Sequence, residues 1–183
     1  MWVIAAALCI VLLAVVGVRH FVVQTYHVPS DSMAPTLKAG EYILVDRHTR
    51  GTAERGSVVV FDGEGYFGGS SRYWVKRVIG VGGDRVRCCT DDGRLEVNGH
   101  ALDEPYLPAS LARASAIDFD VAVPEGRMFL LGDNRDNSSD SRNHLGDPGG
   151  GMVPLKRTQG GVTRVVWPLT DAVSYTHLRA HET

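Results

Sequence analysis

The stretch Tyr73-Trp-Val-Lys-Arg-Val-Ile-Gly-Val81 predicts a β-strand, because β-branched and aromatic residues dominate it and a glycine-rich turn follows. Its composition is that of a strand whose side chains are mostly buried. Lys76 lies in the middle of the stretch, where burial disfavours the charged amine and lowers its pKa. A neutral lysine can act as a general base. The stretch therefore indicates both a β fold and a candidate catalytic group.

Strand patterns of the same kind recur on both sides of this stretch. Valine-rich segments separated by glycine-rich turns occupy most of the chain after Gln24. The expected strands are Glu41–Asp46, Ser57–Phe61, Tyr73–Val81, Arg85–Cys89, Arg94–Val97, His100–Leu102, Phe119–Val123, Arg127–Leu131 and Gly161–Val166. Asn98-Gly99, between two of them, predicts a two-residue hairpin turn. The sequence thus predicts one mainly β domain of antiparallel strands over residues 24–172.

An apolar run precedes this domain. Residues 2–18 contain no Asp, Glu, Lys or Arg, and after Arg19-His20 the apolar pattern resumes at Phe21-Val22-Val23. A helix of about 20 apolar residues spans the ~30 Å hydrocarbon core of a bilayer. A cleavable signal peptide is the alternative, but no basic residue precedes the run and no small-x-small cleavage site follows it. We therefore expect residues 1–23 to form a single-pass, uncleaved transmembrane anchor.

Charge and cysteine content narrow the function further. The formal net charge is -2, which gives no electrostatic footprint for nucleic acid. Of the three cysteines, Cys9 lies in the apolar run, where we expect it to act as a small hydrophobic residue. Cys88 and Cys89 are adjacent, and because a bridge between neighbours is strained we expect two ordinary thiols. No Cys/His set has zinc-ligand spacing, so the sequence predicts no metal site.

A second segment with chemical potential is Pro29-Ser-Asp-Ser-Met-Ala-Pro-Thr-Leu37, just beyond the apolar run. It offers a serine hydroxyl in a turn. A serine activated by a lysine is a recognised variant of the Ser-His-Asp arrangement. A serine that only caps a helix or holds a turn is the alternative. Together with Lys76, the segment predicts a serine nucleophile with a lysine base.

These segments belong to a larger resemblance that extends from about Val22 to Pro168. Four blocks, in order, resemble the boxes of the type I signal peptidases, which are membrane-anchored Ser/Lys proteases. The blocks are Pro29–Leu37, Gly40–Asp46 with Gly56–Phe61, Tyr73–Asp84, and Gly132–Arg142. The resemblance implies a barrel-like antiparallel β domain on the extracytoplasmic face of the cell membrane. It also implies a monomer that removes signal peptides from exported preproteins at Ala-x-Ala sites, with no cofactor or metal.

The resemblance also assigns roles to the reacting groups. Ser32, directly before Met33, matches the nucleophile, and Lys76 matches the general base. The hydroxyl of Ser30 and the backbone N–H of Ser32 match the oxyanion hole. Ser138 matches a serine that orients the lysine amine, although a plain turn serine is the alternative. The resemblance therefore implies a site that joins three distant segments of the chain.

Further residues are expected to support the site or to bind substrate. Asp140 and Arg142 match an ion pair that supports the loop around Ser138, and Asp133 is expected to hold the same loop by hydrogen bonds. Val28 and Met33 are expected to help line shallow apolar pockets for Ala-like side chains of the substrate. These residues are structural or specificity-determining and take no part in proton transfer.

Other interpretations of the same segments are weaker. A calcium loop starting at Asp133 would need glycine at its sixth position and glutamate at its twelfth, where the chain has Ser138 and His144. Gly80-Val-Gly-Gly-Asp84 lacks the last glycine of a dinucleotide loop and is expected to be a strand-end turn. The glycine-rich stretch after Arg142 departs from the family pattern, as does Ser57, where the family often has an acidic residue.

Two alternative functions remain open. Another Ser/Lys protease, such as a self-cleaving repressor, would lack the apolar run, and a catalytically inactive β module would bind exported chains without cutting them.

Residues 173–183 resemble a translated sequencing adapter, and we expect this tail to be an artefact outside the folded domain.

Overall fold

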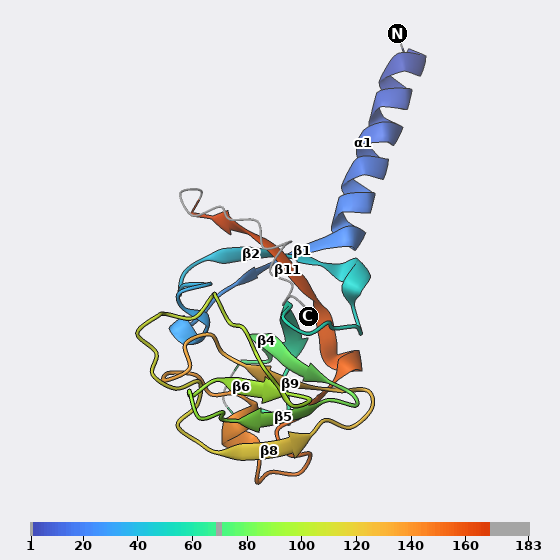
Figure 1. The fold of residues 1–183 in the computed structure, drawn as a ribbon. Helices are drawn as coiled ribbons and strands as arrows, with labels where there is room; N and C mark the ends of the chain where they lie inside the picture. Colours follow the sequence, from blue (N-terminus) through green and yellow to red (C-terminus); the bar gives the residue numbers. More distant parts are fainter. Residues whose placement is uncertain (1, 69–70, 169–183) are drawn as a thin grey trace.

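The N-terminal apolar run forms a helix. The computed structural model describes residues 2–68 and 71–168, and within it α1 (Trp2–Val22) projects from a β body (Figure 1). The first strand, β1 (Val23–His27), follows α1 without a loop. The transmembrane part of the expected fold is not confirmed: in the described ranges, no helix is long and apolar enough to cross a membrane.

The larger of two sheets has the strand order β1-β2-β11-β3-β4-β9-β10. Every neighbouring pair in it is antiparallel. After β1, its strands are β2 (Tyr42–Asp46), β3 (Val58–Asp62), β4 (Tyr73–Val81), β9 (Arg127–Leu131), β10 (Val153–Pro154) and β11 (Thr158–Trp167). The predicted Tyr73–Val81 strand is therefore confirmed as β4, with β3 on one side and β9 on the other.

The smaller sheet has the order β7-β6-β5-β8 and lies at the end of the body remote from α1 (Figure 1). Its strands are β5 (Arg85–Cys88), β6 (Leu95–Val97), β7 (His100–Ala101) and β8 (Phe119–Ala122). The turn between β6 and β7 is the predicted hairpin, in which Asn98 and Gly99 have φ values of 54° and 84°. Both are left-handed, as a type I′ turn requires. The mainly β, antiparallel fold class is confirmed.

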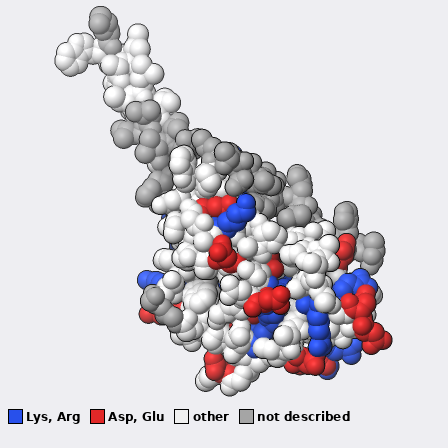
Figure 2. All heavy atoms as spheres, turned by 90° about the vertical axis from the view of Figure 1, so that its left-hand side faces the viewer, with Lys and Arg blue, Asp and Glu red and all other residues white. Residues whose placement is uncertain are grey.

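Short 3₁₀ helices occupy several connections between these strands. They are η1 (Asp31–Met33), η2 (Arg47–Thr49), η3 (Ser141–His144) and η4 (Leu155–Arg157). Residues 102–118, between β7 and β8, contain turns but no helix or strand. On the face shown in Figure 2, acidic and basic side chains intermingle over the β body, and the described atoms of α1 carry neither. The site described below is thus built from strands and the connections between them.

Burial explains why β4 lies inside the larger sheet, between β3 and β9. Residues 75–80 of this strand are all buried. Val75 packs in one core cluster with Val28, Met33 and Leu37, and Val78 packs in another with Phe61. Apolar burial on both faces of a strand favours a central position in a sheet. The polar groups of β4 therefore need partners within the protein.

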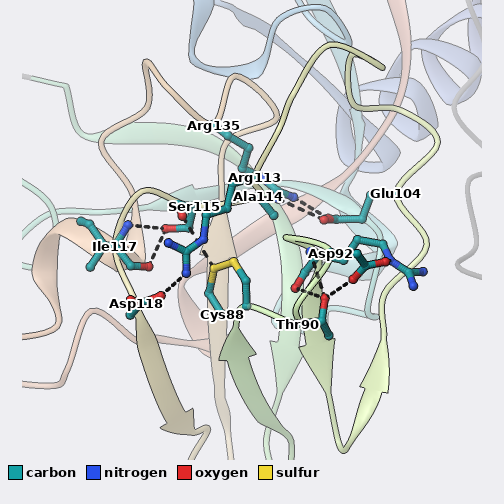
Figure 3. The surroundings of a disulfide bond; sticks show 12 residues. Cys88, Thr90, Asp92, Glu104, Arg113, Ala114, Ser115, Ile117, Asp118 and Arg135 are labelled. Carbon is teal, nitrogen blue, oxygen red and sulfur yellow. Dashed lines mark hydrogen bonds and ion pairs between the residues drawn. A yellow bond between two sulfur atoms is a disulfide. The ribbon is translucent and has the colours of Figure 1, made fainter.

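The structure corrects the expectation for Cys88 and Cys89, which form a disulfide at the end of β5 (Figure 3). Both sulfur-bearing side chains pack against the core cluster of the smaller sheet, and Cys88 Sγ lies 3.8 Å from the carbonyl oxygen of Ser115. The expectation of two free thiols, which rested on adjacency alone, is therefore wrong. The Val173–Thr183 tail lies outside the described residues.

Candidate active site

The nucleophile segment is fixed to the core directly below the predicted serine. Ser32 lies in η1, and the next residue, Met33, is fully buried beside Val28 and Leu37. The backbone N–H of Ala39 donates to the Asp31 carboxylate at 2.9 Å and closes the segment. Ser32 itself remains partly exposed. The local fold thus presents its hydroxyl at the surface on a rigid base.

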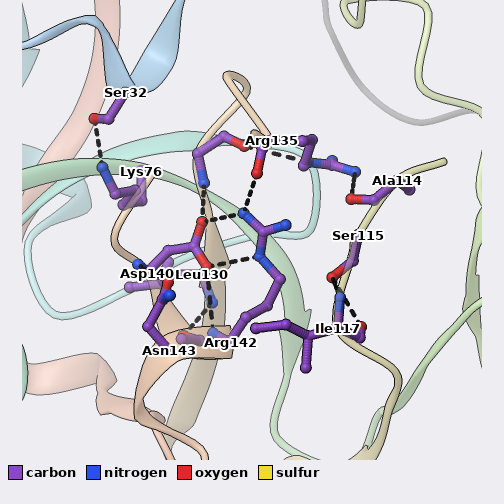
Figure 4. Close-up of polar contacts among 12 residues, drawn as sticks. Ser32, Lys76, Ala114, Ser115, Ile117, Leu130, Arg135, Asp140, Arg142 and Asn143 are labelled. Carbon is purple, nitrogen blue, oxygen red and sulfur yellow. Dashed lines mark hydrogen bonds and ion pairs between the residues drawn. The ribbon is translucent and has the colours of Figure 1, made fainter. Parts of the chain in front are cut away.

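The lysine of β4 meets this serine. Lys76 is 1% exposed, and its Nζ donates to Ser32 Oγ at 2.5 Å (Figure 4). The two residues are 44 positions apart in the sequence. A nucleophile and base within 2.6–3.2 Å, or closer, have the geometry that proton transfer requires.

Burial tunes the lysine for this task. Desolvation lowers the pKa of Lys76 to about 8, because the charged amine loses its water. The carboxylates of Asp140 and Asp133 act to raise the pKa, and the guanidinium of Arg142 acts to lower it. With this pKa, about a tenth of the molecules hold a neutral Lys76 at pH 7. The neutral form is therefore accessible at physiological pH.

Ser30 lies beside the pair on its exposed side. Its hydroxyl donates to Ser32 Oγ at 3.4 Å, and the residue itself is exposed. This distance is long for a hydrogen bond between hydroxyls. The Ser30 hydroxyl is thus close enough to reach a group that reacts with Ser32, as the predicted oxyanion-hole role requires.

Gly132, directly after β9, lets the Gly132–Arg142 segment lie against the nucleophile. A Cβ atom at this position would collide with Ser138 Oγ and with the carbonyl oxygen of Ser32. The N–H of Asn134 donates to that carbonyl at 3.1 Å. Ser138 Oγ is buried and has no hydrogen-bond partner among the described residues. The predicted bond from Ser138 to Lys76 is therefore not formed in this structure, although the two segments are adjacent.

Asp133 anchors the loop through β4. Its two carboxylate oxygens accept bonds of 2.8 and 2.6 Å from the guanidinium of Arg77, and both side chains are 1% exposed. The Thr36 hydroxyl donates to the same carboxylate at 2.5 Å. Burial acts to lower the pKa of Arg77, but the bonds and charge of Asp133, together with Tyr106 and Glu104, outweigh it, so that the pKa is raised. This pair ties the neighbour of Lys76 to the loop.

Asp140 organises the other end of the loop. It accepts bonds from the Gly132 N–H at 3.0 Å and from the Arg142 guanidinium at 2.9 and 2.8 Å (Figure 4). Arg142 in turn donates to the carbonyl oxygen of Arg135 at 2.9 Å. Burial acts to raise the pKa of Asp140, but the bonds from Arg142 and Gly132 hold it below its usual range. Guanidinium groups thus bind the carboxylates of both Asp133 and Asp140.

The structure also shows site residues that the sequence analysis missed. Arg77 was quoted within the Tyr73–Val81 stretch but was given no role, although an arginine in an apolar strand is itself a signal of a buried partner. Glu104, Tyr106 and Arg135 gave no signal at all. Their contacts with the site depend on how an irregular segment folds back over the strands.

A mainly β domain in which a serine hydroxyl meets a buried lysine amine has the groups that a hydrolytic enzyme with a serine nucleophile requires. Comparison with known proteins narrows this class. The model of the family described as "Signal peptidase, peptidase S26" matches residues 1–167. The chain belongs to the signal peptidase family, peptidase S26, and is accordingly a signal peptidase I-type enzyme.

Known signal peptidases align with this chain over most of its length. It is 39% identical to signal peptidase I S of Bacillus subtilis, over 91% of this chain and 89% of that protein. It is 35% identical to signal peptidase I of Mycobacterium tuberculosis, over 81% of this chain and 66% of that protein. A crystal structure of a signal peptidase I from Enterococcus faecalis is 28% identical, with a TM-score of 0.48, over 61% of this chain and 97% of that one.

Proposed function

We propose that this enzyme cleaves signal peptides from exported preproteins by a Ser/Lys mechanism, with Ser32 as nucleophile and Lys76 as general base. The observation that carries the proposal is the 2.5 Å contact between Lys76 Nζ and Ser32 Oγ, made by an amine that is 1% exposed. A lysine in this environment is not a surface cation. It has one hydroxyl partner, and that hydroxyl faces the surface.

Acylation needs three movements around this pair. Neutral Lys76 takes the hydroxyl proton, and Ser32 Oγ forms a bond to the carbonyl carbon of the scissile peptide. The Ser30 hydroxyl and the Ser32 N–H donate to the oxyanion of the tetrahedral intermediate. The C–N bond then breaks, and the Lys76 ammonium returns its proton to the leaving amine. The products of this half are an acyl-enzyme ester and the free N-terminus of the mature protein.

Deacylation uses the same groups. Lys76, neutral again, takes a proton from water, and the hydroxide oxygen attacks the ester carbonyl. Collapse of the second intermediate releases the signal peptide, and the proton on Lys76 returns to Ser32 Oγ. In this cycle Ser138 is proposed to hold the amine in line when its hydroxyl rotates toward Lys76.

The proposed substrate preference rests on membership of the signal peptidase family. Val28 and Met33 are 1% and 0% exposed and pack with Leu37 and Val75. Side chains buried to this degree support the nucleophile segment from within the core, so the predicted pocket lining by Val28 and Met33 is not seen in this structure. We propose Ala-x-Ala sites as substrates because the family resemblance implies them.

Membrane attachment of the enzyme is part of the proposal. Residues 2–18 have no charged side chain, and the strand that leads to the nucleophile begins as soon as α1 ends at Val22. Attachment through residues 1–23, with the β domain on the extracytoplasmic face, would hold Ser32 near the bilayer surface. The apolar segment of a preprotein lies in the same bilayer, so shared attachment raises the effective substrate concentration.

Cleavage of a preprotein whose signal ends in Ala-x-Ala tests this proposal. We expect the parent enzyme in detergent to cut after the second Ala, and Ser32→Ala and Lys76→Ala to lose at least about 10³-fold in kcat/KM. Ser110→Ala and Lys156→Ala change exposed residues of the same types and should cleave normally. Full activity in Ser32→Ala or Lys76→Ala would overturn the mechanism.

A further inference from the structure

Three fully buried ion pairs surround the segment next to Lys76. In each, a guanidinium faces a carboxylate and neither side chain is more than 6% exposed. The pairs are Arg77–Asp133, Arg135–Glu104 and Arg142–Asp140. The first and third belong to the site described above. The second brings in a residue, Glu104, from a segment outside the catalytic blocks.

Glu104 lies in the irregular connection between β7 and β8, which folds over the catalytic loop. Its two carboxylate oxygens accept bonds from the two terminal nitrogens of the Arg135 guanidinium. Tyr106 donates its hydroxyl to Glu104 at 2.5 Å, and its ring covers the Arg77 guanidinium with Cζ 3.7 Å from the ring centroid. Glu104 therefore holds one guanidinium directly and a second through Tyr106.

Backbone bonds in turn connect Arg135 to Asp133 and to Arg142, the partner of Asp140. The Arg135 N–H donates to the carbonyl oxygen of Asp133 at 3.0 Å, and the Arg135 carbonyl accepts from Arg142. The bond from Arg135 Nε to the Gly132 carbonyl at 3.2 Å holds the loop at its start. Figure 4 shows Arg135 beside the Asp140–Arg142 pair, with Lys76 on the other side.

The charges of the three pairs cancel. Three guanidinium groups face three carboxylates, so the three pairs together carry no net charge. The charged groups that act on Lys76 are Asp140, Asp133 and Arg142, and the ring of Trp74 lies 5.7 Å from Nζ. Without Glu104, Arg135 would be an uncompensated positive charge in the same buried cluster. Such a charge disfavours a second cation nearby.

We propose that Glu104 is a positioning residue for catalysis, which neutralises Arg135, seats Tyr106 on Arg77 and so keeps Lys76 both aimed at Ser32 and in a charge-balanced surrounding. This inference rests on the proposed Ser/Lys mechanism. Glu104 acts through other residues and does not touch the reacting atoms. The connection between β7 and β8 thus helps to position the active site through Glu104 and Tyr106.

The test uses the acid limb of the pH profile of kcat/KM, which reports the base of the free enzyme. Glu104→Gln leaves a positive surplus, so the acid limb should move to lower pH by about half a unit or more. Arg135→Gln leaves a negative surplus, so the limb should move to higher pH by a similar amount. The double variant restores neutrality, and its acid limb should return to that of the parent.

Matched controls come from an exposed ion pair, Arg85–Asp120, whose side chains are 70% and 41% exposed. Asp120→Asn and Arg85→Gln make the same charge changes on the surface and should leave the acid limb in place. A structural role for Glu104 alone would lower thermal stability without shifts of opposite sign. Absent shifts, or shifts of one sign, would overturn the inference.

Two further variants keep the outcomes separate. If Lys76→Ala retains activity, the proposed mechanism fails; if Lys76→Ala is inactive but the shifts are absent, only this inference fails. Should Glu104→Gln not fold, Tyr106→Phe keeps the ring on Arg77 and removes only the hydroxyl bond to Glu104. It should lower kcat severalfold with KM unchanged, and an unchanged kcat would also overturn the inference.

Discussion

Two Arg–Asp pairs in this molecule have nearly the same geometry and lie in opposite environments. Arg77–Asp133, at the active site, has bonds of 2.8 and 2.6 Å and is 1% exposed on each side. Arg85–Asp120, on the smaller sheet, has two bonds of 2.7 Å and is largely exposed. Water screens the second pair and not the first. Distance alone therefore says little about what an ion pair contributes, and burial decides it.

The largest expected effect is on the buried pair. Asp133→Ala leaves the Arg77 guanidinium buried without its carboxylate, which should lower the free energy of unfolding by about 3–5 kcal/mol. Urea denaturation followed by circular dichroism measures the change. The double variant Arg77→Met/Asp133→Leu removes both charges and should recover most of the loss. A loss in the double variant that equals or exceeds the loss in the single one would contradict this account.

Replacing the buried Lys76 should raise the free energy of unfolding, whereas Asp133→Ala lowers it. Its pKa of about 8 in the folded state lies below the ordinary 10.5 of the unfolded chain. The folding cost of Lys76 is therefore fully present below pH 8 and is absent above pH 10.5. Lys76→Met should raise the free energy of unfolding by about 3 kcal/mol at pH 7, and the gain should disappear between pH 8 and 10.5. Lys156→Met, at an exposed position, should show no such pH-dependent gain. A gain for Lys76→Met that does not change with pH would refute the explanation by protonation.

Gly132 and Gly146 differ in how closely other atoms approach them. A Cβ at Gly132 would collide with the Ser32 carbonyl and Ser138, whereas nothing lies within 4 Å of a Cβ at Gly146. Gly132→Ala should therefore destabilise the fold by about 1–3 kcal/mol and displace the nucleophile. Thermal unfolding and the rate of preprotein cleavage measure the two effects. Gly146→Ala is the control and should change neither, so equal losses in both variants would argue against a close approach at Gly132.

The smallest effect is expected for the exposed pair. Asp120→Asn should leave the urea midpoint within experimental error, because solvent screens this pair and the side chains lose entropy when they meet. Any difference from the parent should shrink further as salt is added. A drop comparable to that of Asp133→Ala would show that burial is not what separates the two pairs.

Local patterns were sufficient to predict several parts of the fold. β4 was predicted with its observed bounds, Tyr73–Val81, because its apolar composition fits a strand buried on both faces. The Asn98-Gly99 turn was predicted because few other residue pairs tolerate two left-handed conformations. The prediction that Ser32 and Lys76 act together agrees with their contact in the structure, although their catalytic roles stay a prediction.

Other features could not be predicted from any local pattern. The partnership of Glu104, Tyr106 and Arg135 forms only when the connection between β7 and β8 folds over the loop after β9. Cys88 and Cys89 were wrongly predicted to be free thiols, because the expectation considered only their adjacency and not their place beside the core of the smaller sheet. The predicted bond from Ser138 to Lys76 is not formed in the structure, where Ser138 Oγ has no hydrogen-bond partner among the described residues.

Most of the strands, the hairpin turn and the residue types at the site could be predicted, because hydrophobic periodicity and turn residues act over a few neighbours; β1 and β10 were not predicted. Which charges are buried together, and how they balance, could be seen only after folding. The physical reason is that electrostatic energies depend on burial and on partners distant in the chain, and both arise only when the sheets pack.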